Sequence, residues 1–373
     1  AHISDNLAKM TIRDLLTMSS GIVPDWDMRT VCSDWIHTFL SKSVQLPGKS
    51  FKYDSMCSYM LSAIVQKVTG MHLLDYLKDR IFRPLHISEV EWERSPEDIN
   101  TGGWGLYIQS ESLAKFGLLL LHRGNWQGYQ LIPAQWVDEM MRKQIENGKE
   151  GYGYQMWVCE YPTASRADGA LGQYILIVPK TNMVVIITEC SAIDGARQRQ
   201  LVWKELMPKA GSRIVRAGKT YKRLLWIEKN STLPCPSGKA SSTYPVRERF
   251  WNLSSNRYSW KTIEFNWENN GVVMTVTNQE GMKIPIALGY RSWKTIKTSA
   301  YPVYSIYPVG RFTGITGPFW IAGSYAWQKN NILQVNLHDV NWVTVLDLKF
   351  DFLRKVMTIH ENHSHTMMKV PMG

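Results

Sequence analysis

The sequence has few cysteines and no long hydrophobic run. Its 373 residues contain five cysteines, an odd number without Cys-x-x-Cys spacing, which argues against a disulfide framework and against a cysteine zinc site. No apolar run approaches the roughly 18 residues that a membrane-spanning helix needs. The first residues, 1–5, are polar and lack the apolar region of a signal peptide. We therefore expect the cysteines to be mostly small core residues and find no targeting signal in the chain.

Metal and nucleotide motifs are also scarce. The run His360-Glu-Asn-His-Ser-His lacks the helical spacing of a His-Glu-x-x-His zinc motif and follows alternating apolar residues, which favours a polar hairpin turn. The glycines of the stretch 101–105 do not follow a strand of a βαβ unit, so a nucleotide site is not indicated. The sequence therefore predicts neither a metal site nor a cofactor.

The charge balance is basic and tryptophan is abundant. The formal net charge is +11 and the sequence pI is about 9.3, which permits anionic partners but specifies none. Basic residues between 209 and 223 could contact nucleic acid, but a solvated linker explains them more simply. Many of the sixteen tryptophans follow residue 240. They could stack on sugars or bases, or they could fill a barrel core, and the second interpretation needs no ligand.

The first half of the chain alternates between helical and strand periodicity. Segments with helical spacing or helix-start signals come first, followed by three apolar strand patterns and a last helix at about 193–206. The expected helices lie in 8–22, 31–41, 55–70, 72–82 and 110–121 and after Ile132, and the expected strands at 153–158, 171–178 and 183–188. The last two strands are nearly continuous apolar runs, as central strands covered on both faces should be. This order predicts an α+β or mixed α/β domain.

The second half of the chain has a different pattern. Residues 208–247 are basic and then rich in Pro, Ser and Gly, which is typical of a boundary between domains. From residue 248 onward, short strands alternate apolar and polar residues, which predicts an all-β barrel or sandwich. We therefore expect a first domain over 1–207, a basic linker over 208–247 and a β-domain over 248–373.

The stretch 47–70 combines exposed hydroxyl groups with a buried helix. A Pro-Gly turn leads to Tyr53-Asp54-Ser55, and an apolar run with helical spacing then continues to Gly70 at the expected C-terminus of the helix. A tyrosine and a serine placed where a loop enters a helix suit a catalytic hydroxyl pair. The alternative is a buried aromatic ring beside a serine N-cap.

Six segments along residues 8–207, in family order, resemble the serine β-lactamase-related hydrolases, which include class C β-lactamases, DD-peptidases, esterases and amidases. These segments are Leu15-Leu-Thr-Met-Ser-Ser-Gly-Ile, Pro47-Gly-Lys-Ser-Phe-Lys-Tyr-Asp-Ser, Ile81-Phe-Arg-Pro-Leu-His-Ile, Gly102-Gly-Trp-Gly-Leu-Tyr, Gly151-Tyr-Gly-Tyr-Gln-Met-Trp and Ala167-Asp-Gly-Ala-Leu-Gly-Gln. The resemblance implies a helical part beside a five-stranded antiparallel sheet flanked by helices. It also implies acyl transfer through a serine acyl-enzyme.

The resemblance assigns roles to two of the family's three motifs. Tyr53 would be the general base and acid, its phenolate favoured by a nearby ammonium, and Ser55 would hydrogen-bond the substrate. The third motif falls on Ala167-Asp168-Gly169. Gly169 would let substrate approach the strand, and the Ala170 N–H would donate to the oxyanion.

The remaining positions of these motifs complete the candidate site. On the same resemblance, the substrate would also meet three polar side chains near the motifs: Asp54, Asp168 and Gln173. The substrate would be a small molecule or peptide with a carbonyl group. The family implies a periplasmic or secreted protein.

Two departures from the family bear on activity. Position 167 carries no cation, and Arg166 next to it should point to the other face of the strand, which weakens the case for a penicillinase or carboxypeptidase. The Ser-x-x-Lys pattern occurs only at Ser112 and Lys115, downstream of the tyrosine, where the family has a structural helix. We therefore expect the family's N-terminal strands and nucleophile helix to be absent from this sequence.

Two functions remain open on the sequence alone. The native protein could be a serine hydrolase that acts on an amide, ester or lactam. Alternatively, the chain could be a catalytically silent binding module, in which the Trp-rich β-domain recognises a glycan or peptide. An upstream Ser-x-x-Lys in the parent gene would favour the first.

Overall fold

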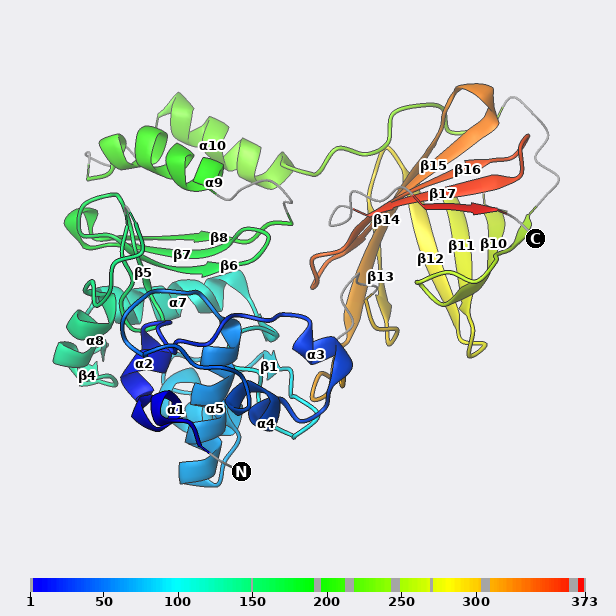
Figure 1. Cartoon of the computed structure of the whole chain (residues 1–373). Helices are drawn as coiled ribbons and strands as arrows, with labels where there is room; N and C mark the ends of the chain where they lie inside the picture. Colours follow the sequence, from blue (N-terminus) through cyan, green and yellow to red (C-terminus); the bar gives the residue numbers. More distant parts are fainter. Residues whose placement is uncertain are drawn as a thin grey trace. The chain divides into compact units, whose positions relative to one another are not determined.

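The computed structural model describes residues 3–148, 150–190, 196–211, 218–242, 249–268, 271–302, 309–361 and 368–371. The chain forms two compact units, each described here by itself (Figure 1). The first contains the described parts of 1–189, 193–210 and 306–316. The second contains the described parts of 190–192, 211–305 and 317–373. The stretch 306–316 lies far beyond the expected end of the first domain at residue 207.

The first unit begins with short helices around one long helix. They are α1 (Asp5–Lys9), α2 (Ile12–Leu16), α3 (Met28–Val31), α4 (Trp35–Leu40), α5 (Ser55–Thr69), α6 (Leu73–Leu77) and a π-helix over Lys78–Phe82. Thr11 and Asp14, three positions apart, have the spacing that predicts a capping box, and they form one at the start of α2. Gly70 ends α5 in the left-handed conformation at φ 69°, which glycine adopts without a Cβ penalty.

The long helix α5 supplies the centre of this helical part. It buries an apolar face against α2 and α4, and the cluster includes Met18, Trp35, Phe39, Met56 and Tyr59. The Tyr59 hydroxyl donates to a carboxylate oxygen of Glu97 at 2.7 Å, so the buried phenol has a partner. A helix held this firmly gives its N-terminal residues a fixed position.

A four-stranded antiparallel sheet forms the other layer of the first unit. Its strands follow the order β5 (Trp157–Val158), β6 (Ser165–Gly169), β7 (Gln173–Val178) and β8 (Met183–Ile187). The helices α7 (Ser110–Leu121) and α8 (Ala134–Met141) pack on one face, against Ile175 and Ile177. The opposite face, with Tyr174 and Leu176, contacts Val202 of the π-helix Val202–Leu206, which follows α9 (Ala196–Leu201). The apolar run of β7 thus lies inside the sheet, as expected, whereas β8 stands at the end of the described strand order with its residues only half-buried, so it is not the central strand that its sequence predicts.

Two small hairpins and one distant segment complete the first unit. The hairpins pair β1 (Val90–Trp92) with β2 (Leu106–Ile108), and β3 (Asn125–Trp126) with β4 (Tyr129–Gln130). The segment 309–316 joins the first hairpin: the Arg94 N–H donates to the Thr313 carbonyl at 2.8 Å. Strand periodicity does not predict the hairpins, because their strands have only two or three residues. It does not predict the contact of Arg94 with Thr313 either, because these residues are far apart in sequence.

The second unit is one curled antiparallel sheet with a single parallel contact, between β12 and β14. Its strands are β9 (Phe250–Asn252), β10 (Trp260–Glu268), β11 (Gly271–Asn278), β12 (Lys283–Tyr290), β13 (Lys294–Thr298), β14 (Phe319–Trp327), β15 (Ile332–Asp339), β16 (Val345–Asp351), β17 (Val356–Glu361) and β18 (Met368–Pro371). The ring of Trp251 on β9 lies 5.1 Å from that of Phe350 on β16. Strands far apart in the sheet order therefore share one core, so the sheet curls as the all-β prediction requires.

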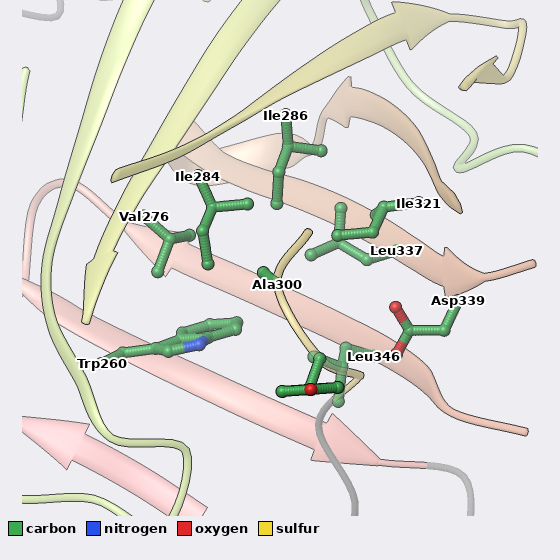
Figure 2. Close-up of a pocket in the computed structure, with 10 residues that line it drawn as sticks. Trp260, Val276, Ile284, Ile286, Ala300, Ile321, Leu337, Asp339 and Leu346 are labelled. Atoms are coloured by element: carbon green, nitrogen blue, oxygen red, sulfur yellow. The ribbon is translucent and has the colours of Figure 1, made fainter. Parts of the chain in front are cut away.

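Inward-facing side chains fill the curled sheet. Trp251, Trp260 and Trp327 are at least 95% buried in its core, which supports the core-filling interpretation of the tryptophans. One cavity among these strands has a volume of about 40 Å³. Figure 2 shows its lining, which is mainly apolar, as at Ile286 and Leu337, with Asp339 at its side. A space of this size holds no more than a water molecule or two.

The expected linker contains a helix. Lys219–Asn230 form α10, a helix that the sequence analysis did not predict within its solvated linker over 208–247. Its residues are exposed throughout. Across the described ranges, no helix combines the length and the apolar character needed to cross a membrane.

Candidate active site

The candidate tyrosine and serine lie at the N-terminus of α5. Asp54 is the N-cap: its carboxylate accepts a hydrogen bond from the Met56 N–H at 2.9 Å, and the residue is only 4% exposed. Ser55 is the first residue of the helix and is 3% exposed. The capping role therefore belongs to Asp54 and not to a serine, and its burial favours a structural role over the expected contact with substrate.

Tyr53 stands just before the cap and is half-buried among aromatic rings. Its ring stacks on that of Trp157 from β5, with centroids 5.5 Å apart, and meets Tyr152 edge-on at 6.5 Å. The Ser55 hydroxyl and the Asp168 carboxylate both act on the electrostatics of the phenol. The stack on Trp157 brings the start of α5 to β5, which pairs with β6 at Trp157 and Arg166.

The environment of Tyr53 holds its phenol in the neutral form. Burial raises the pKa of Tyr53 above its usual 10.0, the hydrogen bond from Ser55 lowers it in part, and the negative charges of Asp168 and Asp54 raise it further. The largest charge effects on this pKa thus come from groups that are negative or become so on ionisation, namely Asp168, Asp54 and Cys57.

A glycine-rich loop, 101–105, covers the first turn of α5. A Cβ atom on Gly103 would lie 2.8 Å from the Ser55 carbonyl oxygen, and one on Gly102, at φ 69°, would lie 2.6 Å from that of Ser58. Backbone approach this close admits only glycine. The next residue, Trp104, packs under the Arg29 guanidinium, 4.8 Å from its ring centroid. The loop therefore fixes one side of the Ser55 environment.

Strand β6 carries the third motif and presents different side chains on its two faces. Ala167 packs in the apolar cluster under α7 and α8. Arg166 and Asp168 share the opposite face, as the alternation of a strand requires. The Arg166 guanidinium donates to Asp168 at 2.7 Å and to Glu150 at 2.9 Å, and its side chain is 3% exposed. Arg166 therefore faces away from Ala167, as expected, and does not replace the missing cation there.

The charges around Asp168 nearly cancel. A second guanidinium, from Arg199, lies 3.5 Å from the same Asp168 oxygen and 3.3 Å from the Tyr174 hydroxyl. Burial lowers the pKa of Arg166, but its hydrogen bonds to Glu150 and Asp168 outweigh this and raise it. Two guanidinium groups thus face two carboxylates, and the cluster has no net charge.

The turn after β6 holds the other predicted residues. Gly169 pairs with Gln173 across the hairpin, and a Cβ atom on Gly169 would lie 2.9 Å from that of Gln173. Ala170 is exposed at the tip, two residues beyond Asp168. The Gln173 amide donates to the Glu189 carbonyl oxygen. Gln173 therefore braces the hairpin, while the roles of Gly169 and Ala170 in substrate binding stay predictions.

The Ser-x-x-Lys pattern in α7 does not form a reactive pair. Ser112 is 6% exposed, and the Lys115 ammonium donates to the His86 carbonyl at 3.2 Å. Elsewhere, the described residues contain no group of three His, Cys, Asp or Glu side chains that could hold a metal ion. His360 and Glu361 lie on β17, so the predicted turn does not begin there, and its remaining residues, 362–365, lie outside the described residues.

The sequence analysis missed three neighbours of the candidate site. Trp157 was part of a family-like segment but had no assigned role, and Glu150 and Arg199 were not singled out. All three meet at β6, a strand that the apolar periodicity did not reveal because its face carries Arg166 and Asp168. The signal that could have revealed this cluster is the pair of charged residues, Arg166 and Asp168, within the third family motif and directly before it.

Comparisons with known proteins agree with this architecture. The profile of the Beta-lactamase family matches residues 1–191. An uncharacterised protein of Alkalihalophilus pseudofirmus is 26% identical over 215 residues, which cover 48% of this chain and 60% of that protein. The chain thus spans about 60% of the length of this curated relative.

Solved structures give only distant similarities. An octameric penicillin-binding protein homologue from Pyrococcus abyssi is 15% identical with a TM-score of 0.44, over 93% of this chain and 81% of that one. A penicillin-binding protein from Bacillus halodurans is 15% identical with a TM-score of 0.39, over 48% of this chain and 67% of that one. The family profile spans half of the chain, and on that match the chain belongs to the Beta-lactamase family.

Proposed function

We propose that this protein is a serine hydrolase in which Tyr53 transfers the protons of an acyl-transfer reaction. The family is one of hydrolases, which supports the reaction class. The proposed substrates are amides, esters or lactams. The observation that supports the assignment of Tyr53 is the stack of its ring on Trp157 of β5, which pairs with Arg166 of β6, since only the fold brings the start of α5 to these strands.

In the proposed reaction, a serine from a Ser-x-x-Lys segment outside residues 1–373 attacks the substrate carbonyl. The serine proton passes to the Tyr53 phenolate, and the C–O bond to the serine forms as the carbonyl becomes an oxyanion. The N–H of Ala170 donates to that oxyanion. Tyr53 then returns the proton to the leaving nitrogen or oxygen as the substrate bond breaks. Water releases the acyl group by the same route.

The raised pKa of Tyr53 sets a requirement for this mechanism. A phenol held neutral by burial and by nearby carboxylates is a poor base at neutral pH. The lysine ammonium of the Ser-x-x-Lys segment would oppose those charges and lower the pKa. In this proposal the lysine helps to activate the serine and also favours the ionised form of Tyr53.

The third motif narrows the proposed substrate class. Position 167 offers no cation to a substrate carboxylate, because Ala167 is apolar and packs in the cluster under α7 and α8, on the face of β6 opposite Asp168. Arg166 and Arg199 are already engaged by Asp168, and Arg166 also by Glu150. A substrate without a carboxylate next to the scissile bond, such as a simple ester or amide, suits this site better than a penicillin.

The test uses the protein that carries the upstream Ser-x-x-Lys segment. A fluorophosphonate probe labels its reactive serine, and intact-mass measurement follows the rate of labelling. Tyr53→Phe should slow acylation by about two to four orders of magnitude, as loss of a general base does. Tyr129→Phe is the matched control, because Tyr129 is 75% exposed. Labelling at Ser112, or equal rates for Tyr53→Phe and the wild type, would contradict the assignment.

A further inference from the structure

The helix α10 (Lys219–Asn230) exposes more apolar surface than a solvated helix needs. None of its residues is buried. Its large apolar side chains are between 42% and 66% exposed: Tyr221, Leu224, Leu225, Trp226 and Ile227. Contiguous apolar surface of this kind marks an interaction site. The catalytic proposal does not use this helix.

The residues of α10 separate into two faces. At about 100° per residue, Tyr221, Leu224, Leu225 and Ile227 share an arc of roughly 160°, interrupted by Glu228. The opposite arc holds the cations Lys219, Lys222, Arg223 and Lys229, with Trp226 among them. The helix is therefore amphipathic, with a basic face and an aliphatic face.

Charge identifies the partner. Residues 209–229 contain seven Lys or Arg and one acidic residue, Glu228. Two such helices would repel one another, which disfavours a second copy of this chain as the occupant. A nucleic acid would satisfy the cations but would leave the aliphatic arc in water. An anionic lipid surface satisfies both faces, since the headgroups attract the cations and the acyl boundary accepts the leucines.

We propose that α10 binds the surface of membranes rich in anionic phospholipid, lying in the plane of the interface. Twelve residues span about 18 Å as a helix, shorter than the roughly 30 Å hydrocarbon core, so the helix does not cross the bilayer. Leu224 and Leu225 enter the acyl boundary, and Lys222 and Arg223 contact the headgroups. Trp226 lies at headgroup depth, where tryptophan is enriched.

The test is co-sedimentation of the full chain with vesicles of phosphatidylcholine, with or without one third phosphatidylglycerol. The chain should pellet with the anionic vesicles and stay in solution with the neutral ones. The variant Leu224→Gln/Leu225→Gln keeps the net charge, so non-specific attraction of a basic protein is unchanged. Its partition coefficient should nevertheless fall at least tenfold, because each leucine loses its burial in the acyl boundary.

Matched controls make this loss specific to α10. Val31→Gln/Val68→Gln changes two valines that are each 79% exposed outside α10, and binding should stay within twofold of the wild type. Lys222→Gln/Arg223→Gln should weaken binding and flatten its salt dependence, whereas Lys294→Gln/Lys297→Gln on β13 should do so far less. Circular dichroism should show all variants folded, because none of the changed residues is buried.

Three results would overturn the proposal. The first is absence of the wild type from anionic vesicle pellets at low salt. The second is equal binding of Leu224→Gln/Leu225→Gln and the wild type. The third is a change of oligomeric state in that variant without a change in pelleting, which would assign the helix to a second copy of the chain.

Discussion

The guanidinium of Arg166 lies 2.7 Å from the carboxylate of Asp168, and both side chains stand on the face of β6 opposite Ala167. The same guanidinium reaches Glu150 at 2.9 Å from a position that is 3% exposed. A buried charge of this kind is retained only where its partners are in place. The third motif of the family here carries a neutralised ion cluster where a free cation would be expected.

We predict that Arg166→Met destabilises the first unit by about 3–5 kcal/mol, because it leaves two half-buried carboxylates without their shared cation. The triple variant Arg166→Met/Glu150→Gln/Asp168→Asn should be more stable than Arg166→Met alone, since the two carboxylates that lose Arg166 are then neutral and only Arg199 has lost an ionic partner. Urea unfolding at neutral pH measures both. Arg123→Met breaks an exposed pair with Asp138 and is the control, with a much smaller loss. Equal losses for Arg166→Met and the triple variant would show that packing, not charge, holds the strand.

A second prediction uses two glycines with the same backbone conformation. Gly70 and Gly102 both have φ 69°, but a Cβ on Gly70 meets nothing within 4 Å, whereas one on Gly102 would lie 2.6 Å from the Ser58 carbonyl oxygen. Gly70→Ala should cost about 1 kcal/mol from the left-handed conformation alone. Gly102→Ala should cost clearly more and should also slow acylation, because the loop against Ser55 must move. Equal losses of stability and unchanged acylation would mean that the loop yields freely.

Local signals in the sequence predicted much of the first unit. The capping box at Thr11 and the final glycine at position 70 depend on neighbouring residues only, so the pattern that predicts them also forms them. Asp54 carried the same kind of signal, because it precedes an apolar helical run. Its family-like neighbours led us to expect a substrate contact there, although the residue caps α5.

Features that depend on distant contacts were not predictable in the same way. Strand β6 has a polar face because Arg166 meets Glu150 and Asp168, and no periodicity reveals such a partner in advance. The helix α10 was hidden by its cations, which suggested a solvated linker. The division of the chain into 1–207, 208–247 and 248–373 stays a prediction, and the stretch 306–316 belongs to the first unit outside those boundaries.

A third prediction concerns alkaline pH. Burial raises the pKa of Tyr53 and Tyr152, and it raises that of the Cys57 thiol to about 12. Below the unfolded tyrosine value of 10.0, each phenol is neutral in both states, so its contribution to stability is fully present. As the pH rises above 10.0, the unfolded chain ionises first and the free energy of unfolding of the first unit falls.

The measurement is urea unfolding at a series of pH values between neutral and alkaline conditions. Tyr152→Phe removes one of these phenols and should reduce the loss of stability above the unfolded pKa. The control is Tyr129→Phe, because its ring is 75% exposed, and its profile should match the wild type. An alkaline loss that is the same in Tyr152→Phe as in the wild type would rule out this buried phenol as a source, and a loss that begins between pH 9 and 10 would point to the Cys57 thiol, whose ordinary pKa is 9.0.

The last prediction concerns the segment 309–316, which lies between β13 and β14 of the second unit in sequence but packs in the first. The Val309 N–H donates to the Arg29 carbonyl at 2.8 Å, and the Thr316 N–H donates to the Glu91 carboxylate at 3.0 Å. Burial raises the pKa of Glu93, while the positive charges of Arg311 and Arg29 lower it in part. Arg29 in turn packs on Trp104 of the loop beside Ser55. The segment therefore contacts the candidate site indirectly, through Arg29 and the loop that carries Trp104.

Replacing 310–315 in the full chain by a Gly-Ser sequence of equal length should lower the thermal transition of the first unit by several degrees and increase amide hydrogen exchange at Gly102 and Gly103. The reason is that the backbone hydrogen bond from Arg94 to Thr313 and the charge of Arg311 near Glu93 are lost together. The same replacement at 279–281, in the turn between β11 and β12, is the control and should affect only the second unit. If exchange at Gly102 and Gly103 stays unchanged while the transition falls, the segment stabilises the first unit without positioning the loop at Ser55.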